Sequence, residues 1–426
     1  MKLISKALVF LIGCLIITLS QAYSGKVVDA KTKAPIEGVI VTLGDQVTKT
    51  AADGSFQLNA QGETLKLRTA GYARQEIPTA NLKTPRANIE LTPFIVKGLY
   101  LSPYGFADKK IRTAALQTLK DNHMNALIID FKGDRGFIPF KVNIPLAQQI
   151  GAQDIILVKD MPTVIADMKK QGLYLIARIV TFKDDKLAAA KPDWAVKKGN
   201  GVFYDREKLR WVDPFNHQVW DYNIAIAKAA ADMGFDEVQF DYVRCPDTTG
   251  VTFSQPSTAE NRVKTISGFL QAAHTALAPS NVMVAADIFG YTTWNKGDTG
   301  IGQQIEEIVK AVDVVSLMLY PSGFHLGIPN YRNPVEHPYE IVYLTLKHVQ
   351  ERTKTSPLHF RPWLQAFRDY AFQRQQFNED KMWQQIKAAN NFGASGYMFW
   401  NPRNVYPKGQ FARENQKETQ SAKDQA

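Results

Sequence analysis

The sequence predicts an α/β fold in which a (β/α)8 TIM barrel follows a small all-β sandwich domain. Up to about residue 94, short alternating runs are separated by turn residues, a pattern typical of β-hairpins. From residue 95 onward, eight apolar runs alternate with segments of helical periodicity. This alternation indicates a parallel sheet covered by helices, and eight units favour a closed barrel. A doubly wound sheet is the alternative, but no Gly-x-Gly-x-x-Gly follows the first strand.

Residues 1–22 have the pattern of a secretory signal peptide. Lys2 and Lys6 precede an apolar run over residues 7–19, and Ser-Gln-Ala at residues 20–22 suits signal peptidase. The run is too short for a transmembrane span, and no later segment approaches one. We therefore expect an exported protein, periplasmic or extracellular, without a transmembrane segment.

The two cysteines bear on processing and redox chemistry. Residues 11–14, Leu-Ile-Gly-Cys, match a bacterial lipobox in which Cys14 would carry a lipid anchor. The apolar run continues past Cys14, where a lipoprotein signal normally turns polar, so the lipoprotein is the minority interpretation. Cleavage after Ala22 leaves Cys245 as the single cysteine, which excludes an intrachain disulfide. No His–Asp pattern surrounds Cys245, and we expect a small buried side chain rather than a nucleophile.

The chain is basic, with a formal net charge of +10 that falls to +8 when Lys2 and Lys6 leave with the signal. This excess favours anionic partners such as acidic glycans or the cell envelope. The bases are scattered, however, and neither an arginine-rich run nor a nucleic-acid-binding signature accompanies them. The charge therefore indicates a solvated surface, and nucleic acid is not expected as a partner.

Residues 23–94 form the predicted all-β domain. Asp53-Gly54 is a strong hairpin signal, because glycine tolerates the positive φ that such a turn requires. The segment resembles the carboxypeptidase regulatory-like domain in four stretches: Gly25-Lys26-Val27-Val28-Asp29, Pro35-Ile36-Glu37-Gly38-Val39, Ala52-Asp53-Gly54-Ser55-Phe56 and Ala70-Gly71-Tyr72. The resemblance implies a transthyretin-like β-sandwich with a role in adhesion or glycan contact. A spacer or stability module is the more conservative interpretation.

Residues 95–406 contain the predicted barrel. Its strands are expected at residues 96–102, 126–132, 174–180, 235–244, 282–288, 312–320, 360–366 and 396–400. Helices are expected at residues 108–122, 161–171, 218–233, 259–277, 301–311, 339–351 and 381–391. An extended loop covers residues 191–215, and residues 407–426 form a polar tail of mixed charge.

The candidate site lies at the carboxyl ends of the strands, where barrels of this kind hold their active sites. Almost every strand carries a polar or aromatic residue near this end, which is costly unless these groups face a wet cleft. The candidates, in chain order, are Asp130, Lys132, Arg178, Asp241, Arg244, Asp287, Tyr320, Gln365 and Trp400. Asp241 and Asp287 end adjacent strands, so the two carboxylates can flank one scissile bond, as glycoside hydrolysis requires.

Roles can be assigned to the carboxylates. Asp241 is the predicted nucleophile or electrostatic stabiliser, kept ionised by Arg244 or Arg178. Asp287 is the predicted general acid, which needs a pKa raised by a drier setting. Asp130 either binds a sugar hydroxyl, shares the acid–base role, or forms a buried ion pair with a neighbouring base.

The remaining candidates are expected to bind the substrate. Lys132, Arg178, Arg244 and Gln365 supply polar contacts, and Tyr320 and Trp400 stack on sugar rings. Glu237 lies low on its strand and is expected to be structural. The histidines at positions 217, 325 and 337 are dispersed without metal-ligand spacing, so the sequence predicts no catalytic metal and no cofactor.

The barrel segment resembles a family of bacterial exported (β/α)8 proteins assigned to the glycoside hydrolases, which is distantly similar to the α-amylase-like hydrolases. The matching residues are Gly98-Leu99-Tyr100-Leu101-Ser102, Ile129-Asp130-Phe131-Lys132-Gly133-Asp134, Gln239-Phe240-Asp241-Tyr242-Val243-Arg244, Ala285-Ala286-Asp287-Ile288-Phe289-Gly290 and Gly396-Tyr397-Met398-Phe399-Trp400-Asn401. The resemblance covers residues 96–402 and implies a retaining-type glycosidase with its nucleophile at Asp241. The chain departs from the α-amylase pattern at Gln239, where that pattern has Arg, and at Asp287, where it has Glu.

The sequence therefore predicts an exported glycoside hydrolase that cleaves O-glycosidic bonds of a polysaccharide by a two-carboxylate mechanism. The alternative is a non-catalytic polysaccharide-binding protein on a glycosidase-like barrel. An esterase is not supported, because no Gly-x-Ser-x-Gly elbow is present.

Overall fold

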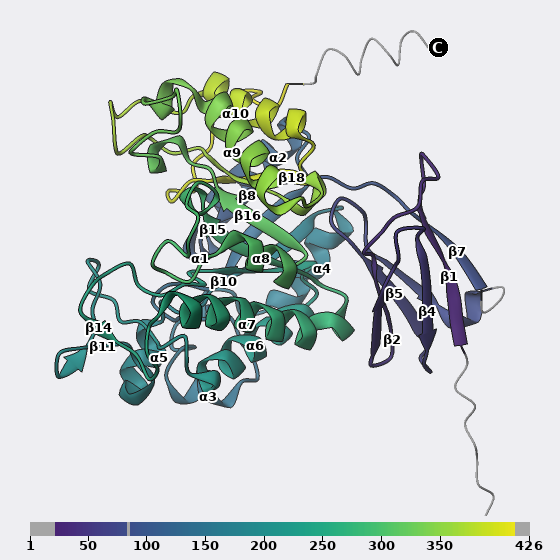
Figure 1. Ribbon diagram of the computed structural model, residues 1–426, viewed down its shortest axis with the longest axis horizontal. Helices are drawn as coiled ribbons and strands as arrows, with labels where there is room; N and C mark the ends of the chain where they lie inside the picture. The colour runs from purple at the N-terminus through teal and green to yellow at the C-terminus, as the bar shows by residue number, and fades with distance from the viewer. Residues whose placement is uncertain (1–21, 83–85, 414–426) are drawn as a thin grey trace, which may run out of the picture.

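The computed structural model describes residues 22–82 and 86–413, which form a small β-sandwich beside a large barrel (Figure 1). Residues 1–22 of the predicted signal, Cys14 included, lie outside the described residues except for Ala22. No helix in these two ranges is long and apolar enough to cross a membrane.

The N-terminal domain consists of two sheets packed face to face, in which the strand pairs are antiparallel except for the parallel pair of β1 and β7. One has the strand order β4-β1-β7 and the other β3-β2-β5-β6. The strands are β1 (Ala22–Asp29), β2 (Ile40–Leu43), β3 (Gln46–Lys49), β4 (Ser55–Asn59), β5 (Thr64–Arg68), β6 (Gln75–Pro78) and β7 (Arg86–Leu91). Gly54 has φ +76°, and a Cβ there would lie 2.5 Å from the Val27 carbonyl oxygen, so the turn requires glycine.

The barrel is closed and parallel, as predicted. Its strands follow one another in chain order around the ring, and the eighth pairs with the first. They are β8 (Val96–Leu101), β9 (Ala126–Lys132), β10 (Tyr174–Val180), β13 (Glu237–Asp241), β15 (Met283–Phe289), β16 (Val314–Met318), β17 (Trp363–Gln365) and β18 (Gly396–Trp400). The predicted (β/α)8 fold is confirmed.

Helices pack around the ring and bury its outer face (Figure 1). The larger ones are α2 (Lys109–Asp121), α4 (Met161–Lys170), α6 (His217–Asp232), α7 (Ala259–Leu277), α8 (Ile305–Ala311), α9 (Pro338–Thr353) and α10 (Glu379–Phe392). Shorter elements are α1 (Pro103–Ala107), α3 (Pro145–Gln149), α5 (Asp185–Ala190) and a small sheet of β11 (Lys197–Lys198), β12 (Gly201–Val202) and β14 (Val251–Thr252). Several helices are capped at their N-terminus by a side chain that accepts a hydrogen bond from a backbone N–H group. Examples are Asp108 before α2 and Thr258 before α7.

An extended segment occupies the place after β18 where a further helix would complete the eighth unit. Phe411 is fully buried, and its ring lies 5.6 Å from that of Phe399 on β18. The backbone N–H groups of Phe411 and Ala412 both donate to the Asn122 side-chain oxygen at the end of α2. The first residues of the predicted polar tail therefore pack against the barrel.

The sandwich docks on the amino-terminal ends of the barrel strands, opposite the predicted site. Arg68 on β5 is fully buried, and its Nε lies 3.3 Å from the Asp313 carboxylate, just before β16. Arg74 pairs with Asp236, which precedes β13, and Lys66 Nζ donates to the Pro279 carbonyl oxygen at 2.9 Å. These bonds tie the two domains together, and the Arg68–Asp313 pair among them is buried.

We predict that Arg68→Ala destabilises the protein by about 3–5 kcal/mol, because it leaves the buried Asp313 carboxylate without its guanidinium partner. Lys26→Ala, which removes one partner of the exposed Lys26–Asp53 pair, is the control and is expected to cost under about 1 kcal/mol. Urea unfolding of both variants checks the prediction. Equal costs would contradict it.

Barrel closure depends on Gly396, the first residue of β18. Its φ is +121°, and a Cβ would lie 1.8 Å from the carbonyl oxygen of Val96 on β8. We predict that Gly396→Ala costs more than about 4 kcal/mol, since both backbones must separate. Gly172 has φ +81° but no heavy atom within 4 Å of a Cβ, so Gly172→Ala reports the backbone strain alone, about 1–2 kcal/mol. Thermal unfolding of the two variants should differ accordingly, and matching melting temperatures would refute the closure argument.

Candidate active site

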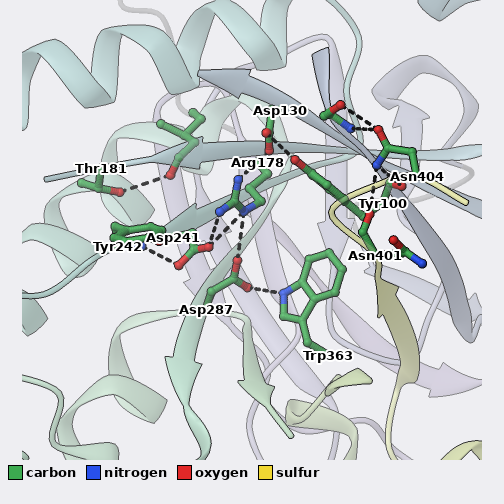
Figure 2. A network of polar contacts seen from close by, with 12 residues as sticks. Tyr100, Asp130, Arg178, Thr181, Asp241, Tyr242, Asp287, Trp363, Asn401 and Asn404 are labelled. Carbon is green, nitrogen blue, oxygen red and sulfur yellow. Dashed lines mark hydrogen bonds and ion pairs between the residues drawn. The ribbon is translucent and has the colours of Figure 1, made fainter. Parts of the chain in front are cut away.

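Arg178 on β10 lies at the centre of the candidate site and contacts carboxylates from three other strands (Figure 2). Its Nη1 donates to Asp130 Oδ1 on β9 at 2.6 Å. Its Nε donates to Asp241 Oδ2 on β13 at 3.0 Å, and Nη2 donates to the same oxygen. Asp287 Oδ2 on β15 lies 3.8 Å from Nε. The guanidinium therefore joins four strands of the barrel at the carboxyl end.

Aromatic side chains enclose this charged cluster. The Tyr100 hydroxyl donates to Asp130 Oδ2 at 2.7 Å, and the Tyr100 ring stacks on Trp400 with centroids 3.8 Å apart. Arg178 Cζ lies 4.8 Å from the Trp400 ring centroid, within range of a cation–π contact. Trp363 Nε1 donates to Asp287 Oδ1 at 2.7 Å. The aromatic groups thus satisfy carboxylate oxygens that Arg178 does not reach.

The three carboxyl groups differ in how readily they hold a proton. Burial raises the pKa of Asp287 well above its ordinary value, and the neighbouring Asp241 carboxylate raises it further. Burial also raises the pKa of Asp130, against the opposing effect of Arg178. One guanidinium cannot neutralise three carboxylates in a dry site, and Asp287 Oδ2 has no hydrogen-bond partner among the described residues. Asp287 is therefore the group of the three that best retains a proton.

A cavity of about 170 Å³ opens beside the cluster at the carboxyl ends of the strands. It is lined by Arg178, Asp241, Tyr242, Arg244, Phe289, Met318, Tyr320, Trp363 and Trp400. Among these lining residues, Asp241 supplies the one carboxylate. The cavity thus combines a fixed negative charge with two guanidinium groups and several aromatic surfaces, a mixture suited to a polar ring-shaped ligand.

The structure brings five of the predicted residues to the cavity: Arg178, Asp241, Arg244, Tyr320 and Trp400. Asp130 and Asp287 lie behind its wall, in contact with Arg178. Asp130 is thus the buried ion-pair partner of Arg178, one of the alternatives that the sequence left open. Asp287 is only 1% exposed and does not line the cavity.

Lys132 does not reach the cavity. A bulge in β9 aligns Lys132 with Ile179 of β10, whereas Asp130 aligns with Arg178. Because the bulge adds a residue, Lys132 faces outward like Ile179, where its Nζ pairs with Asp184 at 2.6 Å, fully buried. Lys132 is therefore not placed to make the predicted contact with a substrate in this cavity.

Gln365 does not line the cavity either. Its Nε2 donates to Ser322 Oγ at 2.7 Å and to the Phe367 carbonyl oxygen, while its Oε1 accepts from the Ser322 backbone N–H at 3.0 Å. All of its polar atoms are used to hold the loop after β16. Gln365 consequently positions the neighbourhood of Tyr320 and offers no free polar atom to a ligand.

Two other predictions can be compared with the structure directly. Glu237 is fully buried near the amino end of β13, and both its oxygens accept from Arg361 Nη1, at 2.8 and 2.6 Å. Its expected structural role is confirmed. Cys245 is 1% exposed, and burial raises the pKa of its thiol to about 12, so it is the buried, unreactive side chain that the sequence indicates.

The loop that follows Asp241 holds a strained backbone. Tyr242 has φ +48°, a left-handed conformation that is rare for a bulky side chain and costs about 1–3 kcal/mol. In the same loop the Tyr242 backbone N–H donates to Asp241 Oδ1. The Asp241 carboxylate is therefore held by backbone on one oxygen and by Arg178 on the other.

The candidates selected from the sequence do not include four lining residues, Tyr242, Phe289, Met318 and Trp363. Apolar residues at strand ends look like core in a sequence, so neither Phe289 nor Met318 could be distinguished from it. Trp363 carries a usable signal, since it is two residues before Gln365 and alternate strand residues share a face. Tyr242 directly follows Asp241, and only its backbone conformation turns it toward the cavity.

The described residues contain no group of three or more His, Cys, Asp or Glu side chains that could hold a metal ion.

The closed barrel, with a carboxylate and aromatic surfaces in a cavity at the carboxyl ends of its strands, has the architecture of a glycoside-hydrolase-like (β/α)8 protein. Residues 98–406 match the family described as "Putative glycosyl hydrolase domain", and the chain belongs to this family. The prediction of a glycoside hydrolase family is confirmed at this level, while the link to α-amylase-like enzymes stays a prediction.

Solved structures are similar to the chain over most of the barrel. A hypothetical protein from Ruminiclostridium thermocellum ATCC 27405 is 32% identical over 44% of this chain and 96% of its own, with a TM-score of 0.41. The PgaB (BpsB) glycoside hydrolase domain from Bordetella bronchiseptica is 14% identical over 73% of this chain and 95% of its own, with a TM-score of 0.51, which shows a shared fold. A class V chitinase from Nicotiana tobaccum is 11% identical over 75% and 97%, with a TM-score of 0.44. Comparison with curated proteins gives no match.

The raised pKa of Asp287 predicts a pH-dependent stability. A carboxyl group whose pKa is raised on folding contributes stability below its unfolded pKa of about 4, and this contribution is lost as pH rises through the folded pKa. Asp287→Asn removes that titration, so the free energy of unfolding of the wild type should fall relative to the variant as pH rises. Urea unfolding over a pH series measures the difference, with exposed Asp167→Asn as the control. A difference that does not change with pH would contradict the prediction.

Proposed function

We propose that the protein is an exported glycoside hydrolase that cleaves O-glycosidic bonds of a polysaccharide in the cavity beside Arg178. The observation that carries this proposal is the state of Asp241: a carboxylate on the cavity wall whose two oxygens are oriented by Arg178 and by the Tyr242 N–H. An ionised, fixed carboxylate next to a sugar ring is what a developing oxocarbenium ion requires. Export by residues 1–22 is part of the proposal and concerns residues outside the described ranges.

Asp241 acts as the nucleophile or as the stabilising anion. The Arg178 guanidinium donates to Asp241 Oδ2 through Nε and Nη2 and restricts its rotation. Tyr320, Trp363 and Trp400 line the same cavity and offer apolar surface to the sugar ring. Neighbouring charge and shape thus favour binding of a sugar with its reacting carbon beside Asp241.

Asp287 acts as the general acid and base. Figure 2 shows its carboxyl group between the Arg178 guanidinium and the Trp363 indole. Its raised pKa keeps a proton available, which is the property a general acid needs. Because Asp287 lies behind the cavity wall, the proton can reach the leaving oxygen only if substrate binding shifts the wall between them. Trp363, which lines the cavity and donates to Asp287, is the side chain that must move.

A non-catalytic polysaccharide-binding protein is the second candidate. It is favoured by the burial of Asp287 and by the single carboxylate among the lining residues, since glycosidases of the two-carboxylate type need both groups at the bond. Binding without turnover would then be the activity of the barrel.

We predict that Asp241→Asn lowers kcat by about 10³- to 10⁴-fold on any polysaccharide that the wild type cleaves, while glycan binding is retained. Asp287→Asn should also lower kcat and should remove the basic limb of the pH–rate profile, because the proton donor is lost. Asp167→Asn controls for loss of an exposed carboxylate. Release of reducing ends measures turnover, and affinity electrophoresis measures binding. If both variants cleave like the wild type, the enzyme assignment fails; if the wild type binds glycans but releases no ends, the binding protein is the correct reading.

A further inference from the structure

Arg244, which is half-buried, differs from the fully buried arginines of the described chain, which anchor structure. Arg68 pairs with Asp313, Arg178 with Asp130 and Asp241, and Arg361 with Glu237. Within residues 22–82 and 86–413, no carboxylate lies within 4.0 Å of the Arg244 guanidinium, and its recorded hydrogen bond is from Nη1 to the Cys245 carbonyl oxygen at 3.0 Å. Arg244 also lines the cavity that contains Asp241.

Aromatic rings hold the Arg244 guanidinium in place. Its Cζ lies 4.8 Å from the ring centroid of Trp211, 4.9 Å from that of Phe289 and 5.3 Å from that of Tyr242. These rings come from three different connections of the barrel, so the group is fixed without an anion. Cation–π contacts offset only part of the cost of removing a guanidinium from water, and the remainder favours an anion that enters from the cavity. Burial lowers the pKa of Arg244, which reflects the same uncompensated charge.

A neighbouring cavity is also lined by arginines that have no carboxylate partner. A second hollow of about 550 Å³ adjoins the first at the end of β18, where Trp400 lines one and Asn401 the other. Arg368 and Arg403 line it and are exposed; Arg368 Nε donates to the Arg374 carbonyl oxygen at 2.6 Å, and neither has a carboxylate within 4.0 Å in the described part of the chain. No aspartate or glutamate is among its lining residues. The lining residues of the two hollows therefore include arginines in both and one carboxylate, that of Asp241.

An aromatic surface connects the two hollows. Phe367 lies edge-on to Tyr320 of the first cavity, with centroids 5.4 Å apart. On its other side Phe367 stacks with Tyr370 at 6.1 Å and an interplanar angle of 9°, and Tyr370 is 65% exposed. Exposed stacked rings beside unpaired guanidinium groups suit a chain of sugar rings that carry negative substituents.

We infer that the polysaccharide substrate is anionic, with Arg244 binding the carboxylate or sulfate group of the sugar beside Asp241 and with Arg368 and Arg403 binding the next charged units. This inference rests on the proposed function, because it names the substrate class of that same site. A planar guanidinium matches a carboxylate or a sulfate with two parallel hydrogen bonds, and each such charge-assisted contact is among the strong ones. In this arrangement the Asp241 carboxylate pairs with Arg178 and lies beside the sugar ring, while the negative substituent of the sugar pairs with Arg244. The two negative groups therefore do not compete for one guanidinium.

The test compares anionic and uncharged polysaccharides, and the polyuronate and its methyl ester form the matched pair that shares one backbone. The probes are a homopolyuronate, its fully methyl-esterified form, a sulfated galactan and a neutral glucan, with dissociation constants measured for the whole protein. The polyuronate or the sulfated galactan should bind at least about 10-fold more tightly than the uncharged probes, and the preferred one identifies the substituent. Equal affinity for the polyuronate and its ester, together with no preference for the sulfated galactan, overturns the inference.

Variants of Arg244 show whether this residue provides the preference. Arg244→Met should lose about 10- to 100-fold in affinity for the anionic probe and little for the neutral ones, and Arg244→Lys should lose less because it keeps the charge without the planar fork. Lys120→Gln removes one exposed charge from α2 and should change nothing. If Arg244→Met binds the anionic probe like the wild type, Arg244 is only a structural stack and the inference is wrong.

Two further measurements keep the outcomes distinct. If Arg244→Met does not fold, as judged by its melting temperature, the double variant Arg368→Gln with Arg403→Gln must still weaken binding of the anionic probe, or the inference fails. Cleavage of a neutral probe alone would refute the anionic substrate while the hydrolase stands. Arg244-dependent binding of an anionic probe without release of reducing ends would refute the hydrolase while the anionic ligand stands.

Discussion

The contact between Arg178 and its three carboxylates is the interaction on which the rest of the site depends. A guanidinium in the interior of a barrel must be paired, and Asp130 and Asp241 supply the pairing. The third carboxyl, Asp287, then has no full counter-charge and holds its proton more tightly. The orientation of Asp241, the raised pKa of Asp287 and the packing of Trp400 over the guanidinium are therefore all linked to the buried charge of Arg178. Gln239 pairs in register with Arg178 on the adjacent strand.

The barrel interior holds charged groups near both ends of the strands, with apolar side chains such as Ile128, Ile176 and Met398 between them. The pairing of these charges determines which end can bind a ligand. Glu237 and Arg361 form a closed pair near the amino end, and the sandwich covers that end through Arg68 and Asp313. Each of these four charged side chains has a partner of opposite charge within the fold. At the carboxyl end, Arg244 lacks such a partner and the aromatic residues face a cavity. The charges named at the amino end are paired within the protein, whereas Arg244 at the carboxyl end is not. A ligand is therefore expected at the carboxyl end.

Prediction from the sequence succeeded where a local pattern is enough and failed where a neighbouring element decides. The periodicity of the apolar runs located β9 and β10 to the residue, because buried strands and amphipathic helices have different repeats. Lys132 could not be placed, since a single bulge in β9 reverses the side to which it points. Nothing in the sequence indicates that the Gln365 side chain has a partner within the protein. That partner, Ser322 on the loop after β16, is 43 positions away in the chain.

The sequence by itself determined the barrel, the position of Asp241 at the end of the fourth strand and the set of residues that could meet it. Alternation and helical periodicity are local properties, and the carboxyl ends of parallel strands must meet at one end of a barrel. Only the tertiary structure decided that Arg178 holds three carboxylates, that Asp287 lies behind the cavity wall, and that Arg244 has no anionic partner. Burial and pairing depend on the distances between strands and loops that are far apart in the chain, and no local pattern contains those distances.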